Sequence, residues 1–142
     1  MTIIADLKRC DYLPIPSDGL VAIGWLGRGA EYTRGVVTSE FVNKLRNLLV
    51  NPWQPVVSGG WHECDLCQFN GPCFNDNLFV PHDGKIYVAP ESIVHYIETH
   101  WYQPPIEFIT AVENCPDMNS MEYKKALLEN GGRPIVKSLG DS

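Results

Sequence analysis

The segment GWHECDLCQFNGPC, residues 60–73, constrains this chain more than any other, because it holds three of the five cysteines. Cys64 and Cys67 have the Cys-x-x-Cys spacing with which two thiolates in a tight turn bind one metal ion. A predicted hairpin and a predicted helix follow, and the helix carries His95 and His100. This order is typical of a Cys2His2 zinc site. The sequence therefore predicts a structural Zn²⁺ ion with Cys64, Cys67, His95 and His100 as its ligands.

The fourth ligand is the open point of this prediction. On a regular helix, five residues correspond to about 140° of rotation, so His95 would point away from the side on which His100 lies. Both histidines can bind one ion if the last turn of the helix loosens, which the following residues 103–105 (Gln-Pro-Pro) favour. His62 is the alternative, because in extended chain its side chain shares a side with that of Cys64. Weaker alternatives are Cys73 and His82.

Other interpretations of the cysteines remain. An odd number of cysteines with no export signal disfavours a disulfide framework, and clustered cysteines in a reducing compartment are more often metal ligands or catalytic thiols. A thioredoxin-like redox pair would lie at the start of a helix in a βαβ unit, whereas Gly71 and Pro72 follow here. Cys64 and Cys67 as ordinary reduced thiols, and His95 as a solvated surface residue, are the plain alternatives.

The rest of the chain predicts an α+β fold with a small antiparallel sheet and about four helices, in which the zinc-knuckle-like ββα segment is embedded. Alternating apolar residues predict a strand at 19–26, and two more strands flank the tight-turn pair Asp83-Gly84. Apolar periodicity and capping residues predict the helices; the first has an apolar face of Phe41, Val42, Leu45, Leu48 and Leu49, with Thr38 or Ser39 as its cap. The ranges of the helices are 38–50, 90–102, 106–115 and 119–131.

Two details of this fold can be checked directly. In the helix at 106–115, Ile106, Ile109 and Val112 are expected to form the inner face. Residues 1–132 are expected to form a single domain with the zinc site in 60–102, and residues 133–142 a flexible tail.

Charge narrows the possible partners. Seventeen acidic and eleven basic residues give a net charge of -6, which repels phosphate backbones and anionic lipid. We therefore expect neither nucleic-acid nor membrane binding, and a protein partner with a basic surface. The N-terminus lacks a long apolar signal region and no stretch approaches the ~18 apolar residues of a membrane span, so a cytoplasmic location is expected.

The segments GWHECDLC and YVAPESIVHYIETHWYQPPIEF, with the earlier GWL, resemble a family of small, uncharacterised bacterial proteins. In that family a GWHxCxxC segment precedes an APxxIxHYIxxHxYxPPxEF helix, and the resemblance covers about residues 58–112. It implies that the residues on this pattern belong to one site. They are Cys64, Cys67, His62, His95 and His100. The resemblance implies no activity.

The ligand set also bears on function. Four Cys and His ligands close a zinc site, whereas catalytic zinc keeps an open position. The sequence therefore favours a non-enzymatic protein that acts through protein contacts, with an inhibitor or immunity-type protein as one specific form. The alternative is a zinc-dependent hydrolase with an open metal site, for which Glu63 and Glu98 are the candidate bases. WHECDLC superficially resembles the zinc-deaminase signature, but there the glutamate is well separated from the cysteines.

Overall fold

The structure is a computed structural model, and it describes residues 3–10, 18–55, 62–64, 66–67, 73–74 and 76–140. For residues 62, 63, 73, 74 and 138–140 it describes the backbone alone. The elements are β1 (Leu20–Ala22), α1 (Ser39–Leu48), β2 (His62–Glu63), β3 (Cys73–Phe74), β4 (Asn77–His82), β5 (Lys85–Pro90), α2 (Ile93–His100), α3 (Ile106–Glu113), α4 (Met121–Glu129) and α5 (Arg133–Gly140). They form one α+β domain, so the predicted fold class is confirmed.

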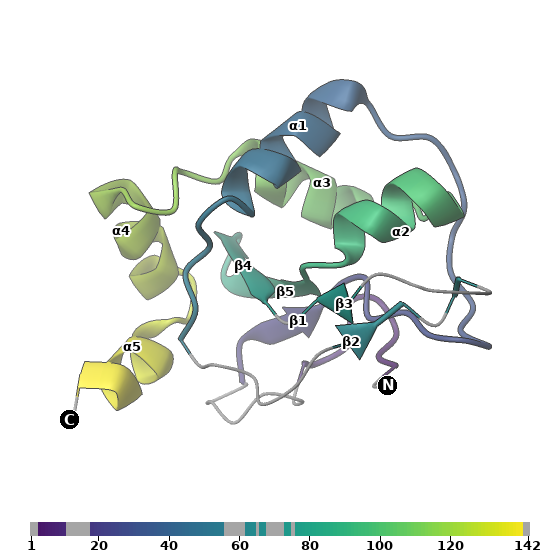
Figure 1. The fold of residues 1–142 in the computed structure, drawn as a ribbon. Helices are drawn as coiled ribbons and strands as arrows, with labels where there is room; N and C mark the ends of the chain where they lie inside the picture. The colour runs from purple at the N-terminus through teal and green to yellow at the C-terminus, as the bar shows by residue number, and fades with distance from the viewer. Residues whose placement is uncertain are drawn as a thin grey trace.

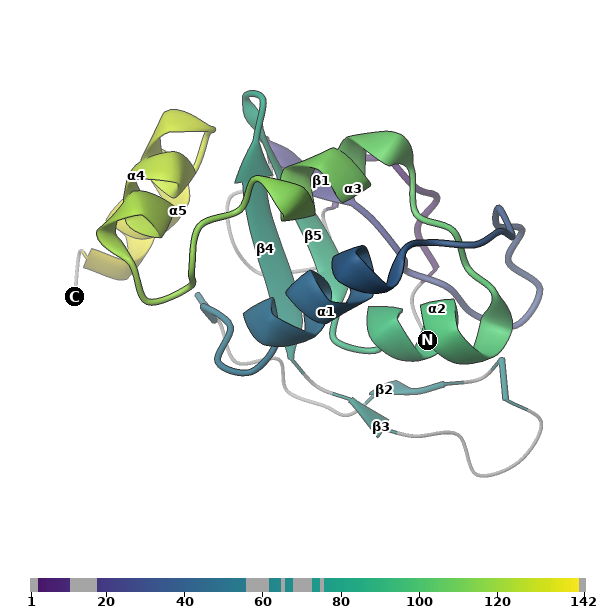
Figure 2. The ribbon, with the colours of Figure 1, turned by 90° about the horizontal axis from the view of Figure 1, so that it is seen from above.

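The elements are arranged in layers around a three-stranded sheet. Helices α1, α2 and α3 lie on one side of this sheet (Figure 1). Helices α4 and α5 lie beyond the β4 edge, and the short β2–β3 pair lies next to α2 at the opposite end of the molecule (Figure 2). Helix α2 therefore stands between the main body of the domain and the segment that carries the cysteines.

The sheet has the strand order β1-β5-β4. Strands β4 and β5 form the predicted antiparallel hairpin, and Asp83 and Gly84 at its turn both have positive φ, 52° and 78°, as a tight two-residue hairpin turn requires. Strand β1 pairs parallel with β5, so the sheet is mixed and not wholly antiparallel. A parallel pair needs a long crossover between its strands, and the chain from β1 to β5 supplies it. Local sequence predicts a strand, but not its direction relative to a distant partner.

Helix α1 follows the prediction closely. The Thr38 hydroxyl accepts a hydrogen bond from the Phe41 N–H at 3.2 Å and so caps the helix. Phe41, Leu45 and Leu48 are buried, as the apolar periodicity predicted. Residues close together in the chain decide both features, which is why the sequence predicts them.

Helix α3 buries part of the face predicted for it, since Val112 is buried and Ile109 packs partly against the core, but not Ile106. Phe108, Ala111 and Val112 are buried, whereas Ile106 is 68% exposed. The Phe108 ring packs edge-on against Phe41 of α1 and Tyr87 of β5, with ring centroids 6.3 and 6.2 Å apart. The expected inner position of Ile106 is therefore wrong, because burial of the largest apolar side chain sets the rotation of the helix.

The C-terminal part of the described chain is helical. Ser120 caps α4 by accepting from the Tyr123 N–H at 3.1 Å, one residue after the predicted start of the helix at 119. Helix α5 occupies residues that the sequence assigned to a flexible tail, and its Ile135 is buried. The sequence analysis missed this helix because about two turns of amphipathic chain give a weak signal. Flexibility of this end, and a domain boundary at residue 132, stay predictions.

Two matched variants test which face of α3 is buried. Phe108→Ala removes a fully buried ring and should lower the free energy of unfolding by about 3–5 kcal/mol. Ile106→Ala removes a mostly exposed side chain of the same helix and should change it by less than about 0.5 kcal/mol. Urea unfolding followed by circular dichroism measures both. Similar losses in the two variants would contradict the rotation of α3 described above.

Candidate metal centre

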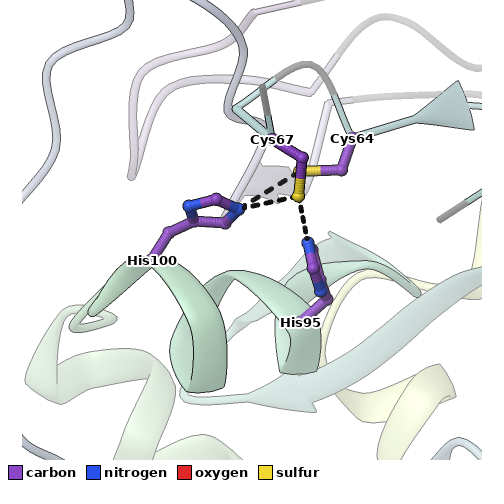
Figure 3. Close-up of side chains that lie close together, drawn as sticks. All are labelled: Cys64, Cys67, His95 and His100. Carbon is purple, nitrogen blue, oxygen red and sulfur yellow. Dashed lines mark hydrogen bonds between the residues drawn. The ribbon is translucent and has the colours of Figure 1, made fainter. Parts of the chain in front are cut away.

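The four predicted ligands come together from two separate parts of the chain. Cys64 directly follows β2, and Cys67 lies in the turn after it, while His95 and His100 project from α2 (Figure 3). Cys64 is buried, and the other three are partly exposed at the edge of the domain. The two cysteines and the two histidines therefore face each other across the gap between the β2–β3 segment and α2.

The spacing of the donor atoms suits one tetrahedral ion. Cys67 Sγ lies 3.2 Å from His95 Nε2 and 3.4 Å from His100 Nε2, and Cys64 Sγ lies 3.5 Å from His100 Nε2. All four donor atoms lie within 4.8 Å of one another. With Zn–S bonds of about 2.3 Å and Zn–N bonds of about 2.0 Å, sulfur and nitrogen in a tetrahedral zinc site lie about 3.5 Å apart. The group is therefore compatible with a metal site.

The last turn of α2 explains how His95 and His100 reach the same place. The N–H of Trp101 bonds to the carbonyl of Tyr96, five residues back, which is one residue wider than the α-helical pattern. Trp101 itself adopts the left-handed conformation, with φ 59° and ψ 22°. A wider turn rotates His100 back toward His95, and the two ring centroids are 5.1 Å apart. The angular conflict expected for a regular helix is thereby removed.

A neighbouring loop holds this widened turn in place. The Tyr32 hydroxyl donates a hydrogen bond to the His100 carbonyl at 3.0 Å. The Gly35 N–H donates to the Trp101 carbonyl at 3.0 Å, and the Gln103 N–H donates to the Thr33 carbonyl at 2.9 Å. The first two bonds satisfy carbonyls that the C-terminal end of the helix leaves free. The position of His100 thus depends on a loop that contains Tyr32, 68 residues earlier in the chain.

Electrostatics favour the neutral histidines that metal binding needs. Burial lowers the pKa of His95, the neighbouring His100 lowers it further, and Glu98 opposes the shift. Burial also lowers the pKa of His100, with a smaller contribution from the positive charge of Arg34. Burial raises the pKa of Cys64. A buried thiol of this kind becomes a thiolate when a cation compensates its charge, so the site suits a bound metal better than a free thiolate nucleophile.

Thr99 adds a contact that the sequence analysis missed. Its Oγ1 lies 3.3 Å from His95 Nδ1. When the hydroxyl accepts from Nδ1–H, the Nε2 lone pair faces Cys67, which is the tautomer a ligand needs. The signal was present in the sequence, because residues four apart on a helix are neighbours on its surface.

Among the alternative ligands and the candidate bases, only His82 and Glu98 have side chains that the structure describes. His82 lies at the end of β4 and is not part of the cluster. The side chains of His62, Cys73 and Glu63 lie outside what the structure describes, so their roles stay predictions. Glu98 is exposed and forms an ion pair with Arg46 of α1.

A family model described as a domain of unknown function, DUF7919, matches residues 2–113. The chain belongs to this family. The DUF7919 match includes the whole range of the predicted resemblance and all four residues of the cluster, while the specific motif of that resemblance stays a prediction. It ends at the last residue of α3, so α4 and α5 lie outside it.

The comparisons with curated proteins and with solved structures found no significant match. Among the helices in the described ranges, none has the length and apolar run that crossing a bilayer requires.

The left-handed residue beside the site leads to a stability prediction. Trp101 is 62% exposed, so its backbone conformation matters more to folding than its packing. Trp101→Gly should be more stable than Trp101→Ala by about 1 kcal/mol, because only glycine adopts the left-handed conformation without a steric penalty. At Lys124, an exposed position inside α4, alanine should instead be better than glycine by about 1 kcal/mol. Thermal and urea unfolding give both rankings, and the same ranking at both positions would contradict the geometry of the widened turn.

Proposed function

We propose that Cys64, Cys67, His95 and His100 bind one structural zinc ion. The convergence of two sulfur and two imidazole donor atoms within 4.8 Å carries this proposal. A mixed thiolate and imidazole set at tetrahedral spacing is the ligand environment that Zn²⁺ prefers. Four protein ligands fill the coordination sphere, so the ion has a structural role and no open position.

The structural role of the ion is to link the cysteine-bearing segment to α2. Three side chains between residues 62 and 74 are described: Cys64 is buried, and Leu66 and Cys67 pack partly against the core. Holding this segment against α2 costs conformational entropy. Metal coordination contributes stabilisation against that cost, as in small domains that fold around zinc.

With a closed zinc site, the protein acts through contacts with another protein in the cytoplasm and not by catalysis. An inhibitor or immunity-type protein that masks a basic surface is the specific form we propose. The net charge of -6 supports a basic partner. The ion pair of Glu98 with Arg46 supports the non-catalytic assignment, because it engages the one candidate base whose side chain is described.

A zinc-dependent hydrolase is the alternative. It would need one histidine to leave the ion so that water could take the fourth position. A cavity of about 430 Å³ beside His95 is the observation that favours it. The metal experiments below separate the two functions.

Metal dependence of stability gives the first test. The purified protein should contain about one zinc per chain. Cys64→Ala and Cys10→Ala each truncate a buried cysteine, 1% and 0% exposed, yet only the first removes a proposed ligand. Cys64→Ala should therefore lose several kcal/mol more stability, and a strong zinc chelator should remove most of that difference. Elemental analysis and thermal unfolding measure these effects. A folded, metal-free wild type would refute the zinc proposal.

Cobalt substitution tests whether the site is closed. The Co²⁺ form should show the absorption of tetrahedral thiolate ligation, unchanged by cyanide or hydroxamate, because no exchangeable water is bound. His95→Ala should open the site and make the spectrum sensitive to these anions. A sensitive wild type would favour the hydrolase and make Glu63 and Glu98 the residues to replace. If neither form is sensitive, His62 is the fourth ligand.

A further inference from the structure

A groove runs between helices α1 and α2, next to the metal centre. It has a volume of about 430 Å³. Its lining residues come from the end of α1 and the two residues after it, and from one side of α2 with Glu91 just before that helix. They are Arg46, Leu49, Val50, Glu91, Val94, His95, Glu98 and Thr99.

The floor of the groove is apolar. Leu49 and Val94 are partly buried where they pack against the core, and Val50 at the end of α1 is 82% exposed. A valine exposed to this degree contributes almost nothing to the core, so its side chain is accessible to another molecule. The volume lies within the range of about 300–1,000 Å³ that is typical of ligand sites. The groove therefore offers apolar surface to another molecule.

The charges around this floor are predominantly negative. Glu98 is compensated by its ion pair with Arg46. Within the described part of the chain, the carboxylate of Glu91 has no hydrogen-bond or ion-pair partner. His95 adds no charge when it binds a metal as a neutral imidazole. One uncompensated negative charge thus lies beside an apolar floor, and this combination is complementary to an apolar side chain next to a basic one.

We propose that this groove binds a basic, amphipathic segment of a partner protein. Its apolar side chains lie on Leu49, Val50 and Val94, and a lysine or arginine pairs with Glu91. The walls are two helices with apolar side chains between them, and an amphipathic helix binds by laying its apolar face into a groove of this kind. The groove is thereby the specific contact surface of the protein-binding function proposed above.

The metal centre and the groove share one residue. His95 lines the groove and is also a proposed zinc ligand. This part of the inference rests on the proposed function: by fixing His95 and the end of α2, zinc holds one wall of the groove in the binding geometry. Removal of the metal should then weaken binding in the groove, although the partner never touches the ion.

The test is an NMR titration of the ¹⁵N-labelled, zinc-loaded protein with a short synthetic peptide. The peptide contains leucine and lysine, with leucine at helical spacing, and a second peptide replaces every lysine with glutamate. The lysine peptide should shift the amide signals of residues 46–50 and 91–99, and the glutamate peptide should bind much more weakly. Shifts centred on another surface, or equal binding of the two peptides, would overturn the proposal.

Matched variants separate the groove from general attraction by an acidic protein. Glu91→Lys should weaken binding of the lysine peptide about fivefold, while Glu129→Lys, on α4 at the other end of the molecule (Figures 1 and 2), makes the same charge change and should have less than about a twofold effect. Val50→Ser should also weaken binding, but Met121→Ser, 75% exposed on α4, should not. Equal effects within either pair would overturn the proposal.

Zinc content, measured in every sample, keeps the two proposals distinguishable. A zinc-loaded protein that fails to bind the lysine peptide overturns the groove and leaves the zinc proposal standing. A zinc-free wild type that binds in the groove supports the groove and refutes the zinc proposal. In zinc-loaded protein, chelation should reduce the affinity for the peptide, and an unchanged affinity would overturn the coupling through His95.

Discussion

The convergence of two cysteines and two histidines is the constraint on which this end of the molecule depends. It joins residues separated by 28 and 36 positions in the chain, Cys67 with His95 and Cys64 with His100. In the described part of the cysteine segment, Cys64 is buried and Leu66 and Cys67 pack partly against the core. The entropic cost of closing a loop grows only slowly with its length, and a metal bridge of the proposed kind can offset it.

That convergence requires a widened last turn at the end of α2, and contacts with the rest of the domain stabilise this turn. Beyond the loop that bonds to His100 and Trp101, the Tyr102 hydroxyl donates to Asp6 at 2.7 Å, and the same carboxylate accepts from the Gly24 N–H at 2.9 Å. Burial, with the nearby negative charge of Asp6, raises the pKa of Tyr102, so this hydroxyl stays a donor. The N-terminal segment, the end of β1 and the chain after α2 are therefore tied together directly behind the site.

Helix α2 has three different sides, each with its own surroundings. Ile93, Tyr96 and Ile97 are buried in the core. His95 and His100 face the two cysteines (Figure 3), and Val94 and Glu98 line the groove toward α1. Because one short helix carries all three sides, the proposed coupling between the metal site and the groove would run through this helix. This shared helix is the physical basis for coupling the two proposed sites.

The sequence by itself determined the features that depend on near neighbours. The spacing of Cys64 and Cys67, the tight turn at Asp83-Gly84 and the cap at Thr38 are local, so they could be predicted together with the α+β class and the four residues that converge. The tertiary structure decided the parallel direction of β1, the rotation of α3 about Phe108 and the added helix α5. It also decided the widened turn before Trp101, which brings His95 beside His100. These features depend on contacts between distant segments, and short stretches of the chain carry only weak signals for them, such as the Gln-Pro-Pro at 103–105 that favours a loosened last turn of α2.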